Sequence, residues 1–90
     1  MSARINVPPS LRDVINDVMT VSVEGNTICE CLIDFVKRYP RADNLLFDKY
    51  GKLYEYIQIF LNKTSIYPEG LSKTVKEADE INILYIIMGG

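Results

Sequence analysis

Alternating apolar and polar residues near the N-terminus predict two short β-strands. Residues 3–7 and 19–23 place apolar or small side chains at every second position, which is typical of a strand with one buried face. Pro8 and Pro9 end the first strand because proline cannot donate a hydrogen bond to a strand ladder. Apolar residues in the segment 10–18 are spaced for a helical turn or a packed loop. We therefore expect a β-hairpin with an unusually long connection.

The periodicity then changes to that of an α-helix. Thr27 and Glu30 fit a capping box, in which the threonine oxygen and the glutamate carboxylate each satisfy a free backbone N–H. Pro40 disfavours helical geometry at the residue before it, so we expect the helix to end at Tyr39. The apolar residues of this segment form one stripe along the helix, namely Ile28, Leu32, Phe35, Val36 and Tyr39.

The segment between this helix and the next strand is expected to be a mixed connection. It covers residues 41–53. We expect its apolar residues 45–47 to pack beneath the domain. Residues 48–52 have the composition of a turn.

The second half of the chain predicts three further strands, at residues 56–61, 65–67 and 81–87. Pro68 confines the second of them to a sheet edge. The last strand is apolar on both faces, as expected of a strand in the centre of a sheet. In the first of these strands we expect Ile57, Ile59 and Leu61 on one face and Tyr56, Gln58 and Phe60 on the other.

The order of these elements favours a two-layer α+β domain with the β-grasp fold. One helix with a single apolar face can cover one face of a mixed sheet of four to five strands. In the β-grasp order the first and last strands lie side by side in the sheet centre. We expect residues 1–88 to form this domain and residues 89–90 to form a flexible reactive tail.

Composition narrows the range of functions. The 90 residues are enough for one modest core. Ten Lys and Arg against 12 Asp and Glu leave a net charge of −2, which lacks the basic surplus that a nucleic-acid groove needs. The absence of His removes the usual general base and metal ligand. We expect a non-enzymatic protein that binds neither nucleic acid nor membrane.

The two cysteines bear on compartment and on metal binding. Because the sequence shows no export signal, we expect reduced thiols and a cytoplasmic location. Cys29 and Cys31 are two residues apart on the predicted helix, so their side chains point to nearly opposite sides. We interpret them as small buried apolar residues and not as a metal site or redox pair.

The chain ends in Gly89-Gly90, and this dipeptide is the strongest candidate for chemistry. Residues without a Cβ can pass through a narrow channel, and they leave the α-carboxylate of Gly90 unhindered. A carboxylate is a poor electrophile, so a partner must first activate it, for example as an acyl-adenylate. Attack by a sulfur donor would then give a thiocarboxylate, and attack by an amine would give an amide. The alternative is a frayed end without function.

Eight segments, in order over nearly the whole chain, resemble the MoaD/ThiS family of ubiquitin-like sulfur carriers, most closely its CysO-type branch. The chain departs from the family pattern at residues 85–88, where the family commonly has a Pro-Ala-Val-Ala-like stretch, and at residues 13–18, which replace a Thr-Gly-Gly-like loop. The matching segments are residues 7–12, 24–28, 38–40, 48–53, 57–62, 70–74, 79–84 and 89–90.

The resemblance implies a sulfur carrier that binds no cofactor of its own. An E1-like adenylating enzyme would activate Gly90 with ATP and Mg²⁺, and a sulfurtransferase step would form the thiocarboxylate. In the CysO-type branch an acceptor synthase of the cysteine-synthase type takes the sulfur, and a metal-dependent peptidase releases the product. The expected product is cysteine or a related amino acid.

Three other functions stay open at this point. The chain can instead be a carrier for molybdopterin or the thiamin thiazole, or a ubiquitin-like modifier that forms isopeptide bonds. It can also be a non-reactive adaptor with an idle tail.

The sheet face away from the helix is the expected docking surface for the activating partner, because large apolar groups there would lie beside the tail residues Met88 and Gly89. A dimer interface, or cover by residues 41–53, is the alternative use of this face. The expected docking residues are Tyr56, Gln58, Phe60, Leu84 and Ile86.

Overall fold

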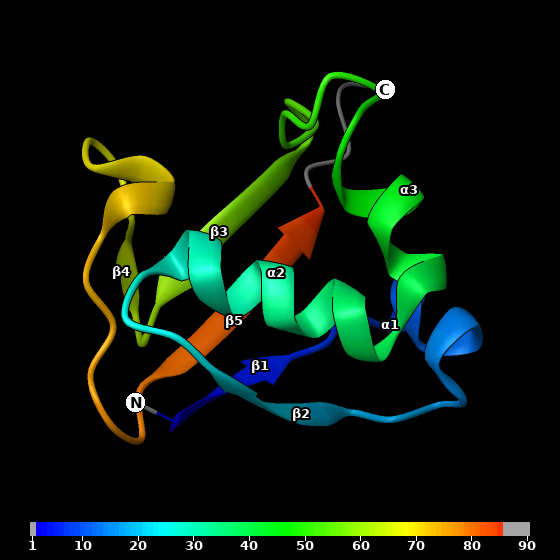
Figure 1. Cartoon of the computed structure of the whole chain (residues 1–90), viewed down its shortest axis with the longest axis horizontal. Helices are drawn as coiled ribbons and strands as arrows, with labels where there is room; N and C mark the ends of the chain where they lie inside the picture. The colour runs from blue at the N-terminus through cyan, green and yellow to red at the C-terminus, as the bar shows by residue number, and fades with distance from the viewer. Residues whose placement is uncertain (1, 86–90) are drawn as a thin grey trace.

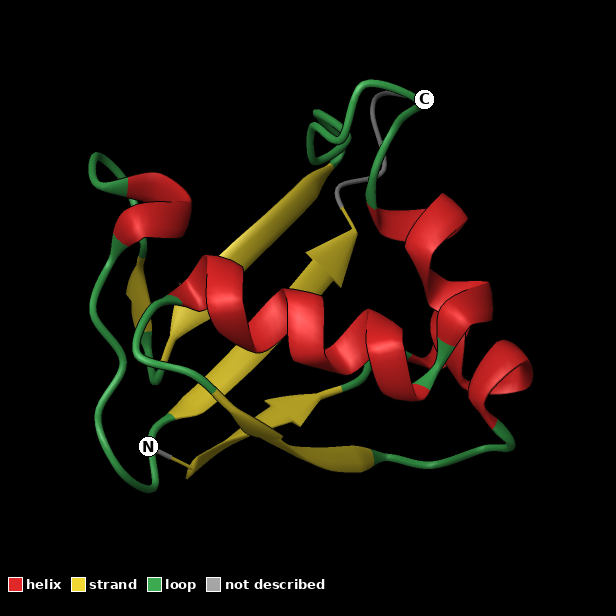
Figure 2. Ribbon diagram, viewed as in Figure 1, coloured by secondary structure: helices red, strands yellow, loops and turns green. Residues whose placement is uncertain are grey.

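A mixed sheet covered on one face by a long helix forms the domain (Figures 1 and 2). The computed structural model describes residues 2–85, apart from the side chains of Ser10 and Val14. The strands are β1 (Ser2–Asn6), β2 (Thr20–Glu24), β3 (Ile57–Leu61), β4 (Thr64–Ser65) and β5 (Glu80–Tyr85). The helices are α1 (Pro9–Arg12), α2 (Ile28–Arg38) and α3 (Asp43–Leu46), with short 3₁₀ helices η1 (Asp13–Ile15), η2 (Pro40–Ala42) and η3 (Gly70–Ser72).

Within residues 2–85 the sheet has five strands in the order β2-β1-β5-β3-β4. Strand β1 pairs antiparallel with β2 and parallel with β5, so that Ile5 lies opposite both Val21 and Ile81. Strand β5 also pairs antiparallel with β3. The predicted α+β β-grasp fold, with the first and last strands side by side, is therefore confirmed.

The predicted hairpin with a long connection is also confirmed. The segment between β1 and β2 contains α1 and η1, which bury Leu11 and Ile15. The connection closes with a backbone hydrogen bond of 2.9 Å from Val7 N to Met19 O. Its two buried side chains explain why the apolar spacing in this segment is helical.

The cap of α2 differs in one hydrogen bond from the predicted capping box. Thr27 Oγ1 accepts from Glu30 N at 3.2 Å, as expected. The Glu30 carboxylate accepts from Asn26 N at 2.7 Å, one residue before the cap, and not from Thr27 N. The helix ends at Arg38, one residue earlier than predicted, because Tyr39 already leaves helical geometry with φ −131° and ψ 76°.

The core lies between α2 and the sheet face that it covers. Phe35 and Leu32 of α2 are fully buried against this face, which Ile5, Ile81 and Ile83 of the two central strands line. Burial of these side chains is the main driving force for folding. In the part of the chain that the structure describes, no helix is long and apolar enough to cross a bilayer.

The connection after α2 contains short helices that the pattern did not predict. Residues 45–47 do pack beneath the domain, with Leu46 fully buried and its two neighbours half-buried. The predicted turn at residues 48–52 is present, and Asp48 Oδ1 accepts hydrogen bonds from the backbone N–H groups of Tyr50 and Lys52. Gly51 has φ +81° there, a conformation that a residue with a Cβ rarely adopts.

Strand boundaries in the second half shift by one or more residues. Strand β3 begins at Ile57, because Tyr56 belongs to the preceding turn. The edge strand β4 is confirmed at the sheet border but covers Thr64–Ser65. Strand β5 begins at Glu80, and its predicted end at Ile87 lies outside the described residues.

The expectation that the last strand is apolar on both faces is wrong for the outer face. Ile81 and Ile83 point into the core, as expected. Outward, β5 carries Glu80, Asn82 and Leu84, and Leu84 is 48% exposed. The strand is central in the plane of the sheet, but the helix covers only one of its faces.

Candidate functional site

The outer sheet face carries a small apolar area over β3 and β5. Gln58 lies opposite Leu84 in the strand register, and Phe60 lies opposite Asn82. Gln58 and Leu84 are exposed, and Phe60 is half-buried. We call Gln58, Phe60 and Leu84 the outer patch. It borders the end of β5 from which the chain continues towards residues 86–90.

A row of hydrogen-bonded polar side chains crosses the same face beside the outer patch. Thr20 Oγ1 donates to Asn6 Oδ1 at 3.3 Å, and Asn6 Nδ2 donates to Asn82 Oδ1 at 2.7 Å. Asn82 Nδ2 in turn donates to the backbone O of Asn62 at 2.8 Å. This polar row connects β2, β1, β5 and the turn after β3. Because its groups satisfy one another, the polar row offers a partner little, and among residues 2–85 the outer patch is the apolar area beside it.

Tyr56 does not continue the outer patch. Its ring lies between two other tyrosines, with centroid distances of 5.1 Å to Tyr54 and 5.8 Å to Tyr85 and interplanar angles of 11° and 21°. Burial, with a smaller contribution from Tyr56, raises the pKa of Tyr85. Tyr56 is 42% exposed, so this tyrosine stack is partly at the surface, next to the end of β5 at Tyr85.

The remaining expected site residues lie outside the described residues. They are Ile86, Met88, Gly89 and Gly90. In the sequence they follow Tyr85 directly, so the chain reaches them from a central strand held between β1 and β3.

The two cysteines occupy different environments. Cys31 is fully buried, and burial together with the charges of Asp34 and Glu30 raises the pKa of its thiol. Cys29 is half-buried, which corrects the expectation that both are core residues, because it faces a groove on the helix side. Neither forms a disulfide. Among residues 2–85 no group of three or more His, Cys, Asp or Glu is placed to hold a metal ion.

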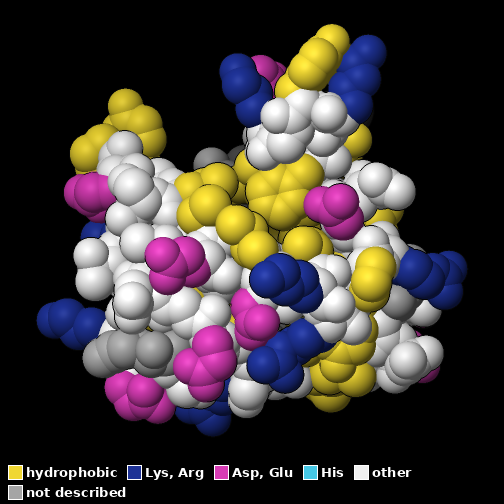
Figure 3. Space-filling model, in the orientation of Figure 1, with side chains coloured by type: hydrophobic (Ala, Val, Ile, Leu, Met, Phe, Trp, Pro, Cys, Tyr) yellow, Lys and Arg dark blue, Asp and Glu magenta, His cyan; other side chains and the backbone are white. Residues whose placement is uncertain are grey.

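That groove lies on the side of the molecule opposite the outer patch. Hydrophobic side chains gather on this side above α2 (Figure 3). The groove has a volume of about 360 Å³ and runs between α2 and the segment from α3 to Gly51. Its apolar lining is Cys29, Ile33, Val36, Phe47 and Leu71.

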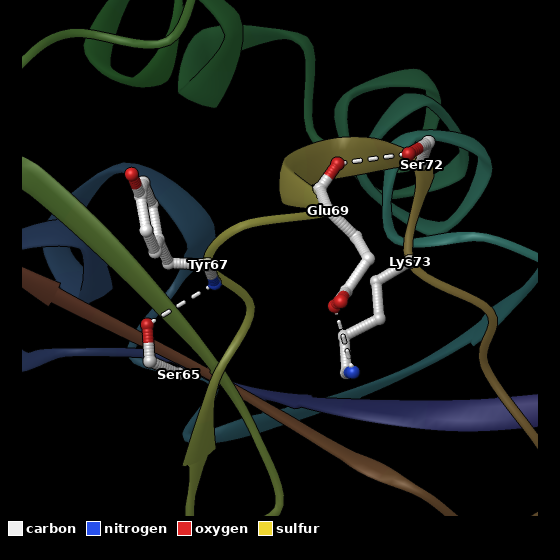
Figure 4. Close-up of polar contacts among 5 residues, drawn as sticks. All are labelled: Ser65, Tyr67, Glu69, Ser72 and Lys73. Carbon is white, nitrogen blue, oxygen red and sulfur yellow. Dashed lines mark hydrogen bonds and ion pairs between the residues drawn. The ribbon is translucent and has the colours of Figure 1, made fainter.

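A second hollow, beside η3, is polar and internally paired. Glu69 and Lys73 form an ion pair of 3.0 Å, and Ser72 Oγ donates to the backbone O of Glu69 at 2.8 Å (Figure 4). Nearby, Ser65 Oγ accepts from Tyr67 N at 3.2 Å. The charge of Lys73 is thus neutralised by a carboxylate four residues earlier. This hollow is therefore a weaker candidate for a binding site than the outer patch.

Comparison of the sequence with known proteins gives no match to a family model or to a curated protein. Comparison of the structure gives full-length matches. SAMP1 of Haloferax volcanii is 22% identical with a TM-score of 0.88 and 100% of both chains covered. CysO of Amycolatopsis orientalis, solved in complex with BexX, is 26% identical with a TM-score of 0.87, and the match covers 98% of this chain and 99% of the other.

The small archaeal modifier protein 1 of Methanosarcina acetivorans matches equally well. It is 25% identical with a TM-score of 0.87, over 99% of this chain and 96% of the other. The chain thus has the structure of the MoaD/ThiS-type ubiquitin-like carriers and modifiers, which are not enzymes. The similar scores do not single out the CysO branch.

Proposed function

We propose that this chain is a sulfur carrier whose Gly90 carboxylate is adenylated by an E1-like enzyme and converted to a thiocarboxylate. The observation that carries the proposal is the full-length match to ubiquitin-like carriers and modifiers, in a chain whose sequence continues from a central strand to Gly89-Gly90. In this proposal the thiocarboxylate donates its sulfur in the biosynthesis of cysteine or of a related amino acid.

The chemistry requires little from the carrier beyond an accessible carboxylate. A carboxylate oxygen of Gly90 attacks the α-phosphate of ATP, with Mg²⁺ held by the partner, and diphosphate leaves. The outer sulfur of a persulfide on the sulfurtransferase then attacks the acyl carbon and displaces AMP. A second thiol of the partner attacks the inner sulfur of the resulting acyl disulfide, so that the thiocarboxylate leaves and a disulfide remains on the partner. Two residues without a Cβ suit this reaction because the partner's active site must enclose the terminus on all sides. The acceptor synthase and the metal-dependent peptidase would act after these steps.

The outer patch supports the proposal as the docking surface of the activating enzyme. Phe60 and Leu84 offer apolar area next to the strand that carries the tail. Aromatic side chains at the centre of an interface contribute most of its binding energy. The polar row on one side and the tyrosine stack on the other limit the contact to this corner of the sheet. Ile86 and Met88 would extend the contact along the tail.

Loading of the carrier by its cognate E1-like enzyme, ATP, Mg²⁺ and a sulfur source tests the function. We expect intact mass spectrometry to show replacement of one terminal oxygen by sulfur. A variant with one alanine added after Gly90 should not be loaded, because the reacting carboxylate is displaced. Native protein that ends beyond Gly90, or a wild-type chain that no E1-like enzyme charges, would contradict the proposal.

The variant Phe60→Asp tests the docking surface separately. A charge at the centre of the outer patch should lower kcat/KM of loading by about tenfold or more, equivalent to about 1.4 kcal/mol of binding energy. Ser22→Asp is the matched control, since it adds the same charge to the same sheet face on β2, away from the outer patch. Equal loading of both variants would remove the outer patch from the proposal.

Protein modification is the second candidate, and the match to the small archaeal modifier protein 1 favours it. It uses the same adenylation and ends in attack by a lysine amine, with AMP or a thiol as the leaving group. Intact mass spectrometry of material from the native cell distinguishes the two, since a modifier gives isopeptide adducts of higher mass. A carrier for molybdopterin or the thiamin thiazole differs only in the enzyme that accepts the sulfur. Using the thiocarboxylate form of this chain to capture its binding partners would identify that enzyme.

A further inference from the structure

Helix α2 carries a second apolar stripe besides the one that faces the core. Cys29, Ile33 and Val36 are spaced by four and three residues, the spacing of side chains along the contact between two paired helices. Val36, predicted in the core-facing stripe, lies at the border of the two stripes: it is half-buried, packs against the core and also lines the groove. These three residues line the groove on the helix side, and Ile33 at the centre of the stripe is 46% exposed. The stripe and the groove together form an apolar surface that nothing in the described part of the chain covers.

Charges beside this stripe are arranged with opposite signs at its two ends. Glu30 and Lys37 are exposed and seven residues apart, so they lie on the same flank of α2, one on each side of Ile33. Glu30 precedes Ile33 by three residues and Lys37 follows it by four. Glu30 also caps the helix, with its Oε1 accepting from Asn26 N. The flank is therefore negative towards the start of the helix and positive towards its end.

This arrangement is complementary to itself in one orientation. If two copies of α2 cross antiparallel with Ile33 on the two-fold axis, Glu30 of each copy lies beside Lys37 of the other. In a parallel two-fold arrangement this charged flank would lie on opposite sides of the contact in the two copies, so Glu30 and Lys37 would not pair. An isologous contact of this kind needs the same surface on both subunits, which a single helix with this pattern provides.

We propose that the groove and the second stripe of α2 bind a second copy of this chain, through an antiparallel contact of the two α2 helices. The proposal is independent of the chemistry at Gly90. Helix α2 has 11 residues and is about 16 Å long, so the contact is small and the dimer weak. Helix α2 covers one face of the sheet (Figure 1), and the outer patch lies on the other face, so both outer patches stay open in the dimer.

Sedimentation equilibrium of the full chain from micromolar to millimolar concentration tests this proposal. The average mass should rise from 10.3 kDa towards twice that value. Ile33→Glu should raise the dissociation constant at least tenfold, with an unchanged circular dichroism spectrum because the side chain is exposed. Leu84→Glu is the matched control, since Leu84 is equally exposed on the opposite face and should leave the dimer intact. A chain that stays monomeric, or a dimer lost in Leu84→Glu but not in Ile33→Glu, would overturn the proposal.

Charge reversal and cross-linking test the orientation. Lys37→Glu should weaken the dimer, and the double variant Glu30→Lys/Lys37→Glu should restore it. With Cys29→Ser as background, Ile33→Cys should form a disulfide dimer on mild oxidation, because residues on the two-fold axis come within disulfide reach. Leu84→Cys in the same background should cross-link much less. Equal cross-linking at both positions, or no restoration by the double variant, would show that the helices do not pair in this way.

Discussion

Gly25 shows how the absence of one side chain sets the distance between β2 and α2. A Cβ at this position would lie 2.8 Å from the backbone N of Cys31 and 2.8 Å from the Cβ of Glu30. Real Cβ atoms do not approach other atoms so closely, so the turn or the first turn of α2 would have to move. Glycine is required here for space.

Gly25→Ala should therefore lower the free energy of unfolding by about 1–3 kcal/mol, as overpacking does elsewhere. Denaturant unfolding measures the change. Gly51→Ala is the control for a different cost: a Cβ there meets no atom within 4 Å, but the backbone has φ +81°. Its cost should be about 1 kcal/mol and conformational in origin. A neutral Gly25→Ala would show that the turn adjusts freely.

At the scale of single residues, alternation placed Gln58, Phe60 and Leu84 on the outer face correctly, but it also placed Tyr56 there, which instead stacks with Tyr54 and Tyr85. The period of two holds only inside a strand, and the sequence gives no sign that β3 begins one residue after Tyr56. The stack of Tyr56 with Tyr85 joins residues far apart in the chain. A local pattern cannot contain such a contact.

Among the elements, α2 is tied to β2 by one carboxylate. Asp34 Oδ2 accepts from the backbone N of Glu24 at 2.9 Å and from Arg38 Nε at 3.1 Å. The pKa of Asp34 lies below its usual value of 3.8, mainly because its carboxylate accepts the hydrogen bond from Glu24 N. The helix is thereby fixed along its exposed side as well as through the core.

Asp34→Asn should lower the free energy of unfolding at neutral pH by about 1 kcal/mol, a small value because the ion pair with Arg38 is exposed. A lowered pKa in the folded state means that the contribution of the carboxylate is complete above the usual pKa and is lost as the pH falls below it. The difference between wild type and variant should therefore shrink in acid. Denaturant unfolding at several pH values checks this. Ser22→Ala is the control, since it removes no titratable group from an exposed position, and its effect should not depend on pH in this way.

The long elements could be predicted because each has its own apolar period. Helix α2 needed correction only at its end and in the hydrogen bond of Glu30. Helix α3, with four residues, was missed because contacts with distant segments stabilise it, such as the 3.0 Å hydrogen bond from Tyr54 N to Leu46 O. Short elements of this kind have too few residues to show a period.

For the molecule as a whole, one core supports both exposed surfaces. Phe35 is fully buried at the centre of α2 and also contacts the ring of Tyr39, with centroids 5.7 Å apart. The outer patch and the helix-side groove lie on opposite sides of this core. Both surfaces therefore depend on the packing of this one core for their shape.

Phe35→Ala should therefore lower the free energy of unfolding by about 3–5 kcal/mol, a large part of the stability of a small domain. Thermal unfolding followed by circular dichroism should show one cooperative transition at a lower temperature. Tyr67→Ala, at a position 84% exposed, should change the midpoint little. A loss confined to the helix, with the sheet signal unchanged, would contradict a single shared core.

The order of elements sufficed to predict the architecture of the sheet and its helix. The polar row itself was missed, because Asn82 meets Asn6 and Asn62 only after β1, β5 and β3 have come together. The position of a side chain within a strand shows which face it occupies. It does not show which residues of neighbouring strands lie beside it.

The placement of β5 has a mechanical consequence. Strand β5 is bonded on one side to parallel β1 and on the other to antiparallel β3. Tension on the chain beyond Tyr85 acts along the strand, so both ladders are loaded in shear and many hydrogen bonds resist at once. An edge strand such as β4 has a ladder on one side only, so fewer hydrogen bonds would share the same load. A partner can therefore pull on the end of this chain without unravelling the domain that carries it.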